Sequence, residues 1–189
     1  MRPPVDAATA LVRIVEALAG GASGSPGVVL LDGRSGSGKS TLTTMAAERM
    51  PGTGVVRLDD VYPGWDGLRA ASEQLVTGIL GPYSRHEPGH WRRWDWTADA
   101  PGRRETVDPS RPLLVEGVGA LPAAARPLAV LTVWVELDED TRRERALARD
   151  GDTYAPHWSR WAAQEEEYLA REHPVDSADL VIDGRSILG

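Results

Sequence analysis

The sequence predicts an α/β fold with a five-stranded parallel sheet and helices on both faces. Short apolar runs alternate along the chain with segments of helical periodicity, which is typical of parallel strands joined by helices. Residues 33–41 read GRSGSGKST and fit the phosphate-binding pattern G-x-x-x-x-G-K-[ST]. This motif lies between an apolar run at 28–32 and a helical pattern at 40–50, the context it requires. The fold class expected is therefore that of the P-loop nucleoside triphosphate hydrolases.

The other elements follow in chain order, and we expect them to form a single domain over residues 1–189 because this length suits one α/β core. A helix is predicted over 7–19, where Leu11, Ile14, Val15 and Leu18 recur at helical spacing. A glycine-rich connector follows at 20–27. Further strands are expected at 55–58, 113–117, 130–135 and 180–182, and further helices at 68–80, 138–149 and 159–171.

Periodicity fails between residues 81 and 112, a stretch rich in Pro, Gly, Arg and Trp. A long segment without regular structure inside a compact domain is usually a lid or a binding region, so we expect an insertion of that kind. Its densest part, residues 91–96, reads WRRWDW. These tryptophans could stack on a substrate while Asp95 accepts from its hydroxyls, or they could simply pack the loop against the domain.

Composition excludes several function classes. The formal charge of −7 disfavours nucleic-acid binding, which needs a basic surface. No run of 18 apolar residues occurs, so we expect no membrane span and a cytoplasmic protein. Cysteine is absent, and His86, His90, His157 and His173 lack metal-ligand spacing. The partner expected is a small molecule, and self-association is left open.

The phosphate loop carries the strongest functional signal. The chain contains twenty arginines but one lysine, Lys39, at the lysine position of the motif. A compact ammonium between the β- and γ-phosphates cannot be replaced by a guanidinium, which argues against a mere glycine-rich linker. Backbone N–H groups and the following helix N-terminus would bind the phosphates of ATP. The expected nucleotide-binding residues are Gly33, Ser35, Gly36, Ser37, Gly38, Lys39, Ser40 and Thr41.

Oxygen ligands for Mg²⁺ fall at the loop and at predicted strand ends. Ser40, Asp59 and Glu116 would supply a hydroxyl and two carboxylates, a set that Mg²⁺ accepts together with phosphates and water. Side chains alternate along a strand, so only one of Asp59 and Asp60 is expected to face the site. Either carboxylate could instead only cap the element that follows it.

Three arginines share one face of the helix predicted at 138–149. Arg142, Arg145 and Arg149 are spaced i, i+3 and i+7, which suits a lid that neutralises a transferring phosphoryl group. The alternative is a solvated face on which Glu139 and Glu144 pair with them.

These motifs together resemble the uridine kinase-like branch of P-loop kinases over residues 28–183. The matching elements, in order, are GRSGSGKST, LDDVY at 58–62, WDW at 94–96, VEG at 115–117, and DEDTR at 138–142 continuing to 149–150. The resemblance implies that Asp59 is the general base near Mg²⁺, that Glu116 approaches Mg²⁺, and that the lid arginines touch phosphates. It also implies that Tyr62 and Asp95 hold the substrate. Uridine kinases read FDHP where this chain has WDWT, a departure at the acceptor.

The function expected is transfer of the γ-phosphoryl group of Mg·ATP to a hydroxyl of a small metabolite, with a nucleoside such as uridine as one candidate. One alternative is a nucleotide-binding module or slow ATPase that has no acceptor. Another is a nucleoside-monophosphate kinase, whose acceptor phosphate would need arginines more than a base. Arg92, Arg93, Arg103 and Arg104 could supply them.

Overall fold

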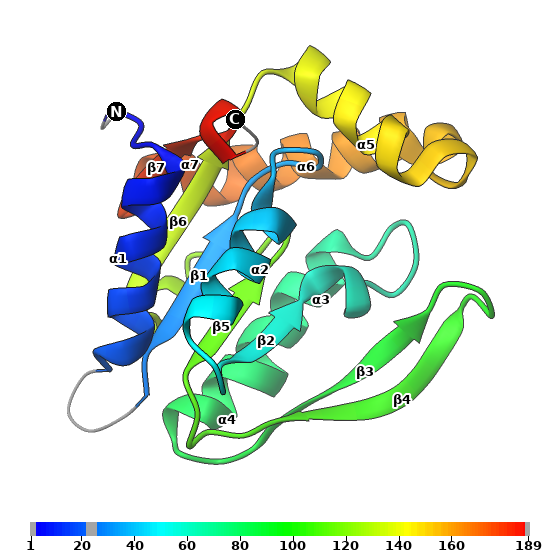
Figure 1. Ribbon diagram of the computed structural model, residues 1–189. Coiled ribbons are helices and arrows are strands. Elements are labelled where there is room, and N and C mark those ends of the chain that lie inside the picture. The colour runs from blue at the N-terminus through cyan, green and yellow to red at the C-terminus, as the bar shows by residue number, and fades with distance from the viewer. Residues whose placement is uncertain (1–2, 22–25, 188–189) are drawn as a thin grey trace.

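The computed structural model describes residues 3–21 and 26–187. Its main sheet has five parallel strands in the order β2-β5-β1-β6-β7 (Figure 1). The predicted fold class is confirmed. The strand bounds differ from those expected by at most one residue at either end. The strands are β1 (Val28–Asp32), β2 (Gly54–Arg57), β5 (Leu113–Glu116), β6 (Leu131–Glu136) and β7 (Leu180–Asp183).

Helices cover both faces of this sheet, as predicted. α1 (Ala7–Ala19) and α2 (Lys39–Arg49) pack on one face, while α3 (Leu68–Gln74) and α6 (Trp158–Glu172) pack on the other (Figure 1). α5 (Glu139–Tyr154) extends beyond the carboxyl ends of the strands. Two short helices complete the set, α4 (Gly81–Ser84) and α7 (Pro174–Ser177).

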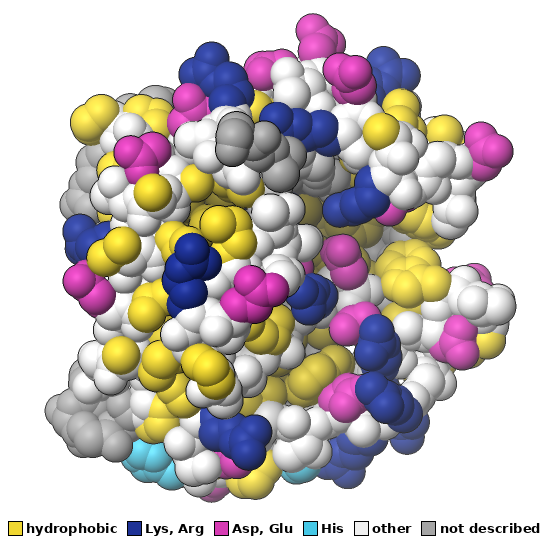
Figure 2. Space-filling model, in the orientation of Figure 1, with side chains coloured by type: hydrophobic (Ala, Val, Ile, Leu, Met, Phe, Trp, Pro, Cys, Tyr) yellow, Lys and Arg dark blue, Asp and Glu magenta, His cyan; other side chains and the backbone are white. Residues whose placement is uncertain are grey.

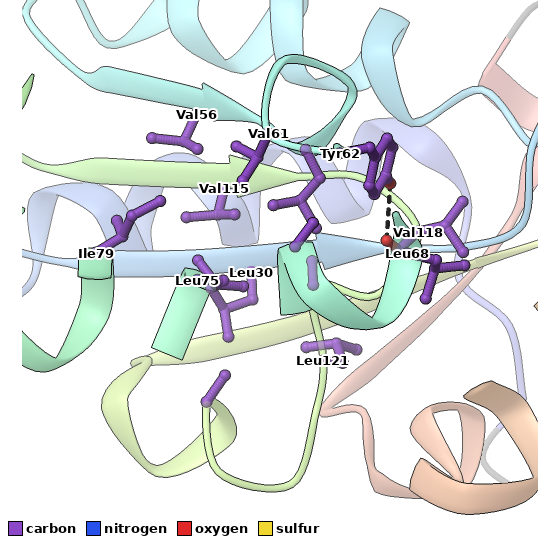
Figure 3. Close-up of a cluster of buried hydrophobic side chains, with 14 of the residues drawn as sticks. Leu30, Val56, Val61, Tyr62, Leu68, Leu75, Ile79, Val115, Val118 and Leu121 are labelled. Atoms are coloured by element: carbon purple, nitrogen blue, oxygen red, sulfur yellow. Dashed lines mark hydrogen bonds between the residues drawn. The ribbon is translucent and has the colours of Figure 1, made fainter. Parts of the chain in front are cut away.

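The unbroken apolar run of β1 follows from burial of both its faces. Val29 and Leu31 join the core beneath α1 and α2, whereas Val28 and Leu30 join the core on the opposite face. Figure 3 shows Leu30 within that second core, close to Leu75. A strand buried on both sides needs apolar side chains at every position, which is why these residues do not alternate with polar ones.

The N-terminal helix forms as its pattern predicts. Asp6 caps it by accepting a hydrogen bond from the backbone N–H of Thr9 at 2.7 Å. Leu11, Ile14 and Leu18 are buried against the sheet. The connector expected at 20–27 lies partly outside the described residues, since 22–25 are not among them.

The region after α3 is more regular than expected. The helix predicted at 68–80 is α-helical to Gln74 and then continues as a π-helical segment, Leu75–Leu80. The stretch 81–112 is not irregular, because it contains α4 and an antiparallel hairpin of β3 (Gly89–Asp95) and β4 (Ala100–Val107). The hairpin escaped prediction because most of its side chains are partly or fully exposed, so no apolar alternation marks its strands.

Two further boundaries differ from expectation. The strand expected at 55–58 ends at Arg57, and Leu58–Asp60 forms a 3₁₀ turn. The helix expected to end at 149 continues to Tyr154 across a break at Gly151, whose φ of 53° and ψ of −133° are not helical. Among the residues that the structure describes, no helix is long and apolar enough to cross a membrane.

Candidate active site

The phosphate loop joins β1 to α2 at the carboxyl edge of the sheet. Gly36 and Gly38 have φ values of 81° and 106°, a backbone conformation that L-residues with side chains rarely adopt. These left-handed residues turn successive backbone N–H groups towards one concave side, which makes an anion site at the N-terminus of α2. The Lys39 ammonium donates a hydrogen bond to the Arg34 carbonyl at 3.1 Å and so lies across the loop.

The loop is also fixed from outside by the start of α5. A Cβ atom added at Gly36 would lie 2.1 Å from the carbonyl oxygen of Arg142, so only glycine fits there. Arg142 itself is buried, and its guanidinium donates to the carbonyl oxygens of Leu137 at 3.0 Å and Ser35 at 3.4 Å. The base of α5 and the phosphate loop therefore pack as one unit.

Two carboxylates face this loop from neighbouring strands. Glu116, the last residue of β5, is buried, and its Oε1 lies 3.4 Å from Nε of Arg57. Asp59 is accessible to solvent within a concave surface and surrounded by protein groups. This enclosure raises the pKa of both carboxyls above the usual range, and the positive charge of Lys39 opposes the rise in each. Both groups are therefore placed to gain from a bound cation.

The residues present fit a magnesium ion. Oε1 of Glu116 is buried without a hydrogen-bond partner, and the Ser40 hydroxyl is near enough to this carboxylate to lower its pKa. Within residues 3–21 and 26–187, no three His, Cys, Asp or Glu side chains are grouped to hold a metal. An ion held by Ser40, Glu116 and Asp59 would thus need phosphate oxygens and water as further ligands, which is the coordination Mg²⁺ prefers in nucleotide sites.

Two cavities meet at the phosphate loop. The smaller, of about 450 Å³, is lined by the loop itself and by Arg145 and Arg149 of α5. The larger, of about 590 Å³, is lined by Asp59, Arg57 and a group of aromatic side chains. Ser40 and Arg149 line both cavities. In Figure 2 this face of the molecule is hollowed between the part that carries α5 and the β3–β4 hairpin. The arrangement offers one space for phosphates and a second space beside it.

The three arginines expected on one face of the lid helix do not share one environment, because two of them border the cavities and the third is buried. Arg145 donates to the Gly184 carbonyl at 3.4 Å and borders the smaller cavity. Arg149 forms a two-point ion pair with Asp150, with N···O distances of 2.8 and 2.6 Å, and borders both cavities. Arg142 is committed to the backbone contacts beneath the loop. Arg145 and Arg149 are thus in position to contact a phosphoryl group, and Glu139 and Glu144 form no ion pair with any of the three within the described residues.

The two residues predicted to bind substrate, Tyr62 and Asp95, lie in different positions relative to the larger cavity. Tyr62 lines the larger cavity with its ring, but its hydroxyl donates to the Val118 carbonyl at 2.8 Å (Figure 3). Asp95 does not line this cavity. Its Oδ1 accepts from the backbone N–H groups of Thr97 and Ala98, both at 3.0 Å, and shapes the hairpin turn. The neighbouring Trp96 reaches the cavity instead and donates from Nε1 to the Asp59 carbonyl at 2.9 Å.

The pair of aspartates after β2 is divided as expected, although by a different geometry. Asp59 faces the larger cavity, while Asp60 forms an ion pair with Arg93 of the hairpin at 2.7 Å. The 3₁₀ turn, not strand alternation, sends these side chains in different directions. Asp60 therefore anchors the hairpin beside the cavity.

Sequence reasoning missed a carboxylate that holds the start of the loop. Glu165 of α6 is 2% exposed and accepts from Nε of Arg34 at 2.8 Å and from the Ser35 backbone N–H at 2.9 Å. It also accepts from Nε1 of Trp161 at 3.1 Å. Glu165 stands in a run of three glutamates at 165–167, so only its burial distinguishes it from its neighbours.

A second buried carboxylate, Asp32, ends β1 directly before the loop. It accepts from the backbone N–H groups of Gly33, Gly119 and Leu121, and from the Tyr168 hydroxyl at 2.6 Å. Complete burial raises the pKa of Asp32 to about 6 despite these donors. The sequence placed Asp32 within an apolar strand and gave no signal of this network, because three of its four donors come from segments 87 to 136 residues away.

Comparison with solved structures finds the same fold in two proteins whose names describe them as possible or putative kinases. A structure named "possible uridine kinase" from Bacillus stearothermophilus matches with a TM-score of 0.67 and 18% identity, over 93% of this chain and 98% of that one. A "putative fructose transport system kinase" from Silicibacter sp. TM1040 matches with a TM-score of 0.55 and 19% identity, over 95% and 98%. The fold implied by the resemblance is confirmed. No family model matches the chain, and no curated protein matches it either.

Proposed function

We propose that the protein is an ATP-dependent kinase that transfers the γ-phosphoryl group to a hydroxyl of a small molecule. The observation that carries this proposal is the meeting of two cavities at Ser40 and Arg149. One cavity is built for phosphates and the other is large enough for a metabolite. An ATP-binding module without an acceptor would need only the first. The kinase fold of both structural neighbours supports the proposal.

The donor end would be bound by the phosphate loop. Its backbone N–H groups and the Lys39 ammonium would hold the β- and γ-phosphates, and Arg145 and Arg149 would face the transferring group from α5. Mg²⁺ held by Ser40 and Glu116, with Asp59 nearby, would neutralise charge on the phosphate oxygens.

Asp59 would act at the acceptor end. Its carboxylate lines the larger cavity, where the acceptor would bind, and would accept the proton of the attacking hydroxyl. The acceptor oxygen would then bond to the γ-phosphorus as the bond to the β,γ-bridging oxygen breaks, and ADP would leave. The raised pKa of Asp59 would make it a better proton acceptor than an aspartate of ordinary pKa.

A specific observation disfavours a phosphate acceptor. The four hairpin arginines that such an acceptor would need do not line the larger cavity. Arg93 is paired with Asp60, and Arg103 with Glu105 at 2.5 Å. A hydroxyl acceptor fits the cavity better, and the resemblance makes a nucleoside such as uridine one acceptor to test. A kinase that uses ATP in this way would act in the cytoplasm.

The deciding experiment measures ADP release by the purified protein with panels of alcohols, sugars, nucleosides and nucleoside monophosphates. A hydroxyl kinase should show acceptor-stimulated release, and Asp59→Asn should lower transfer by roughly 10²–10⁴-fold while ATP still binds. If the lost function is only metal binding, high Mg²⁺ should partly restore it. Release that no acceptor stimulates would leave only the slow ATPase or nucleotide-binding module.

A further inference from the structure

The larger cavity has an aromatic wall assembled from separate parts of the chain. We call this wall the aromatic box, and its members are Tyr62, Trp65, Trp96, Tyr154 and Trp161. Trp65 is its centre. The Trp65 ring stacks on His157 at a centroid distance of 4.2 Å and with Tyr154 at 5.5 Å, and it is tilted against Trp96 at 5.0 Å and meets Trp161 edge-on at 6.4 Å. A ligand ring would therefore lie against the Trp65 edge and the more exposed Trp96.

Most polar atoms of the aromatic box are already bonded within the protein. The Tyr62 hydroxyl donates to Val118, Nε1 of Trp161 donates to Glu165, and Nε1 of Trp96 donates to the Asp59 carbonyl. Tyr62 and Trp161 are 2% and 4% exposed, whereas Trp96 is 40% exposed and presents most of the open ring surface. None of these three rings keeps a spare donor for a ligand, but the Tyr154 hydroxyl is buried without a hydrogen-bond partner. Open ring surfaces bind flat, weakly polar surfaces by stacking and exclusion of water.

The charged groups of the cavity are also largely committed. Arg149 is paired with Asp150, and Arg57 lies beside Glu116. Asp59 remains for the reacting hydroxyl. The other polar groups that remain are the hydroxyl groups of Ser35, Ser40, Thr153 and Tyr154. A ligand with more polar substituents than these groups can satisfy would lose affinity, since each buried polar group left without a hydrogen bond is costly.

We propose that the acceptor is an alcohol carried on a flat ring with few hydrogen-bonding substituents, with the ring stacked in the aromatic box and its hydroxyl at Asp59. This inference rests on the proposed kinase function. It distinguishes ring-bearing alcohols, such as benzyl alcohol and indole-3-ethanol, from polyhydroxylated sugars and from nucleosides whose bases have polar edges. Specificity of this kind arises because a site that has few polar partners penalises polar ligands.

The first test compares indole-3-ethanol, benzyl alcohol, uridine and fructose as acceptors in ADP release. The ring-bearing alcohols should give kcat/KM values at least about tenfold above those of uridine and fructose, since one unpaired polar group costs on the order of a tenfold loss. A higher kcat/KM for uridine or fructose would overturn the inference and leave the kinase function intact. Absence of stimulation by any alcohol, sugar or nucleoside would instead overturn the kinase function.

The second test uses variants of the box. Trp65→Leu should raise KM for indole-3-ethanol about tenfold or more, and Trp65→Phe should retain most of the affinity because it keeps a ring to stack on. Trp91→Leu is the matched control, since Trp91 is also half-buried against the same core but lies outside the cavity. Saturation-transfer NMR with indole-3-ethanol gives a readout that needs no turnover. Equal binding to Trp65→Leu and to the unaltered protein would contradict the inference.

Discussion

Glu165 and Ser35 are joined by a hydrogen bond of 2.9 Å from the Ser35 backbone N–H to the Glu165 carboxylate. Through this bond α6 holds the first turn of the phosphate loop. Glu165 also accepts from Trp161, which belongs to the wall of the larger cavity. One buried carboxylate therefore contacts the walls of both the proposed phosphate site and the proposed acceptor site.

Glu165→Gln is expected to weaken Mg·ATP binding about tenfold, because it removes the charge that orders Arg34 and Ser35. Isothermal titration calorimetry measures this affinity. Glu166→Gln is the matched control, since Glu166 is bonded to the same Arg34 guanidinium at 2.5 Å but is 64% exposed. Exposed pairs contribute little, so Glu166→Gln should bind ATP almost normally. Equal losses in the two variants would contradict a special role for the buried carboxylate.

Lys39→Ala is expected to abolish measurable ATP binding, because the sole lysine supplies the only ammonium at the phosphate site. Lys39→Arg should not restore it, since a planar guanidinium cannot occupy the place of a compact ammonium. Calorimetry with Mg·ATP tests both variants, and circular dichroism establishes that they are folded. Unchanged affinity in folded Lys39→Ala would refute the phosphate-site assignment.

Arg145→Ala is expected to affect turnover, whereas Arg142→Ala is expected to affect the stability of the fold. Arg145 borders the smaller cavity, the proposed phosphate site, so its loss should lower kcat roughly 10- to 100-fold while ATP binding changes less. Arg142 is buried under the loop beside Glu165, so its loss should reduce the free energy of unfolding by about 3 kcal/mol. Urea denaturation and steady-state kinetics separate the two effects. A destabilised Arg145→Ala with normal kcat would reverse this assignment.

The pH dependence of turnover should report Asp59. A base must be deprotonated, and enclosure raises the pKa of this carboxyl. The activity should therefore fall as the pH decreases, and half of it should be lost above the ordinary aspartate value of about 3.9. Mg²⁺ bound nearby would move this limb to lower pH, because a cation favours the carboxylate. A rate that stays constant down to pH 4 at low Mg²⁺ would count against Asp59 as the base.

Tyr168→Phe is expected to reduce the free energy of unfolding by about 2 kcal/mol, because it removes a donor from the buried carboxylate of Asp32. Tyr83→Phe is a suitable comparison, since the Tyr83 hydroxyl donates to the uncharged Arg111 carbonyl at 2.6 Å. The loss there should be smaller, about 1 kcal/mol. Urea denaturation at neutral pH measures both. A larger loss in Tyr83→Phe would show that the charge on Asp32 does not govern the stability of this network.

The sequence by itself determined the sheet, most helices and the phosphate loop. These elements depend on local patterns: apolar runs specify the buried strands, helical spacing specifies α1, and GRSGSGKST requires glycines where the backbone has positive φ. The sequence also predicted that Asp59 and Glu116 lie beside the loop, because the carboxyl ends of parallel strands lie on one edge of the sheet.

Only the tertiary structure decided which polar residues serve the site and which serve the scaffold. Arg142 and Arg145 are equivalent in the helical pattern, but packing against Gly36 buries the first and leaves the second at the cavity. Glu165 and Glu166 are adjacent and identical in type, and only the position of α6 over the loop separates them. These distinctions depend on contacts between residues more than 100 positions apart, so no local pattern encodes them.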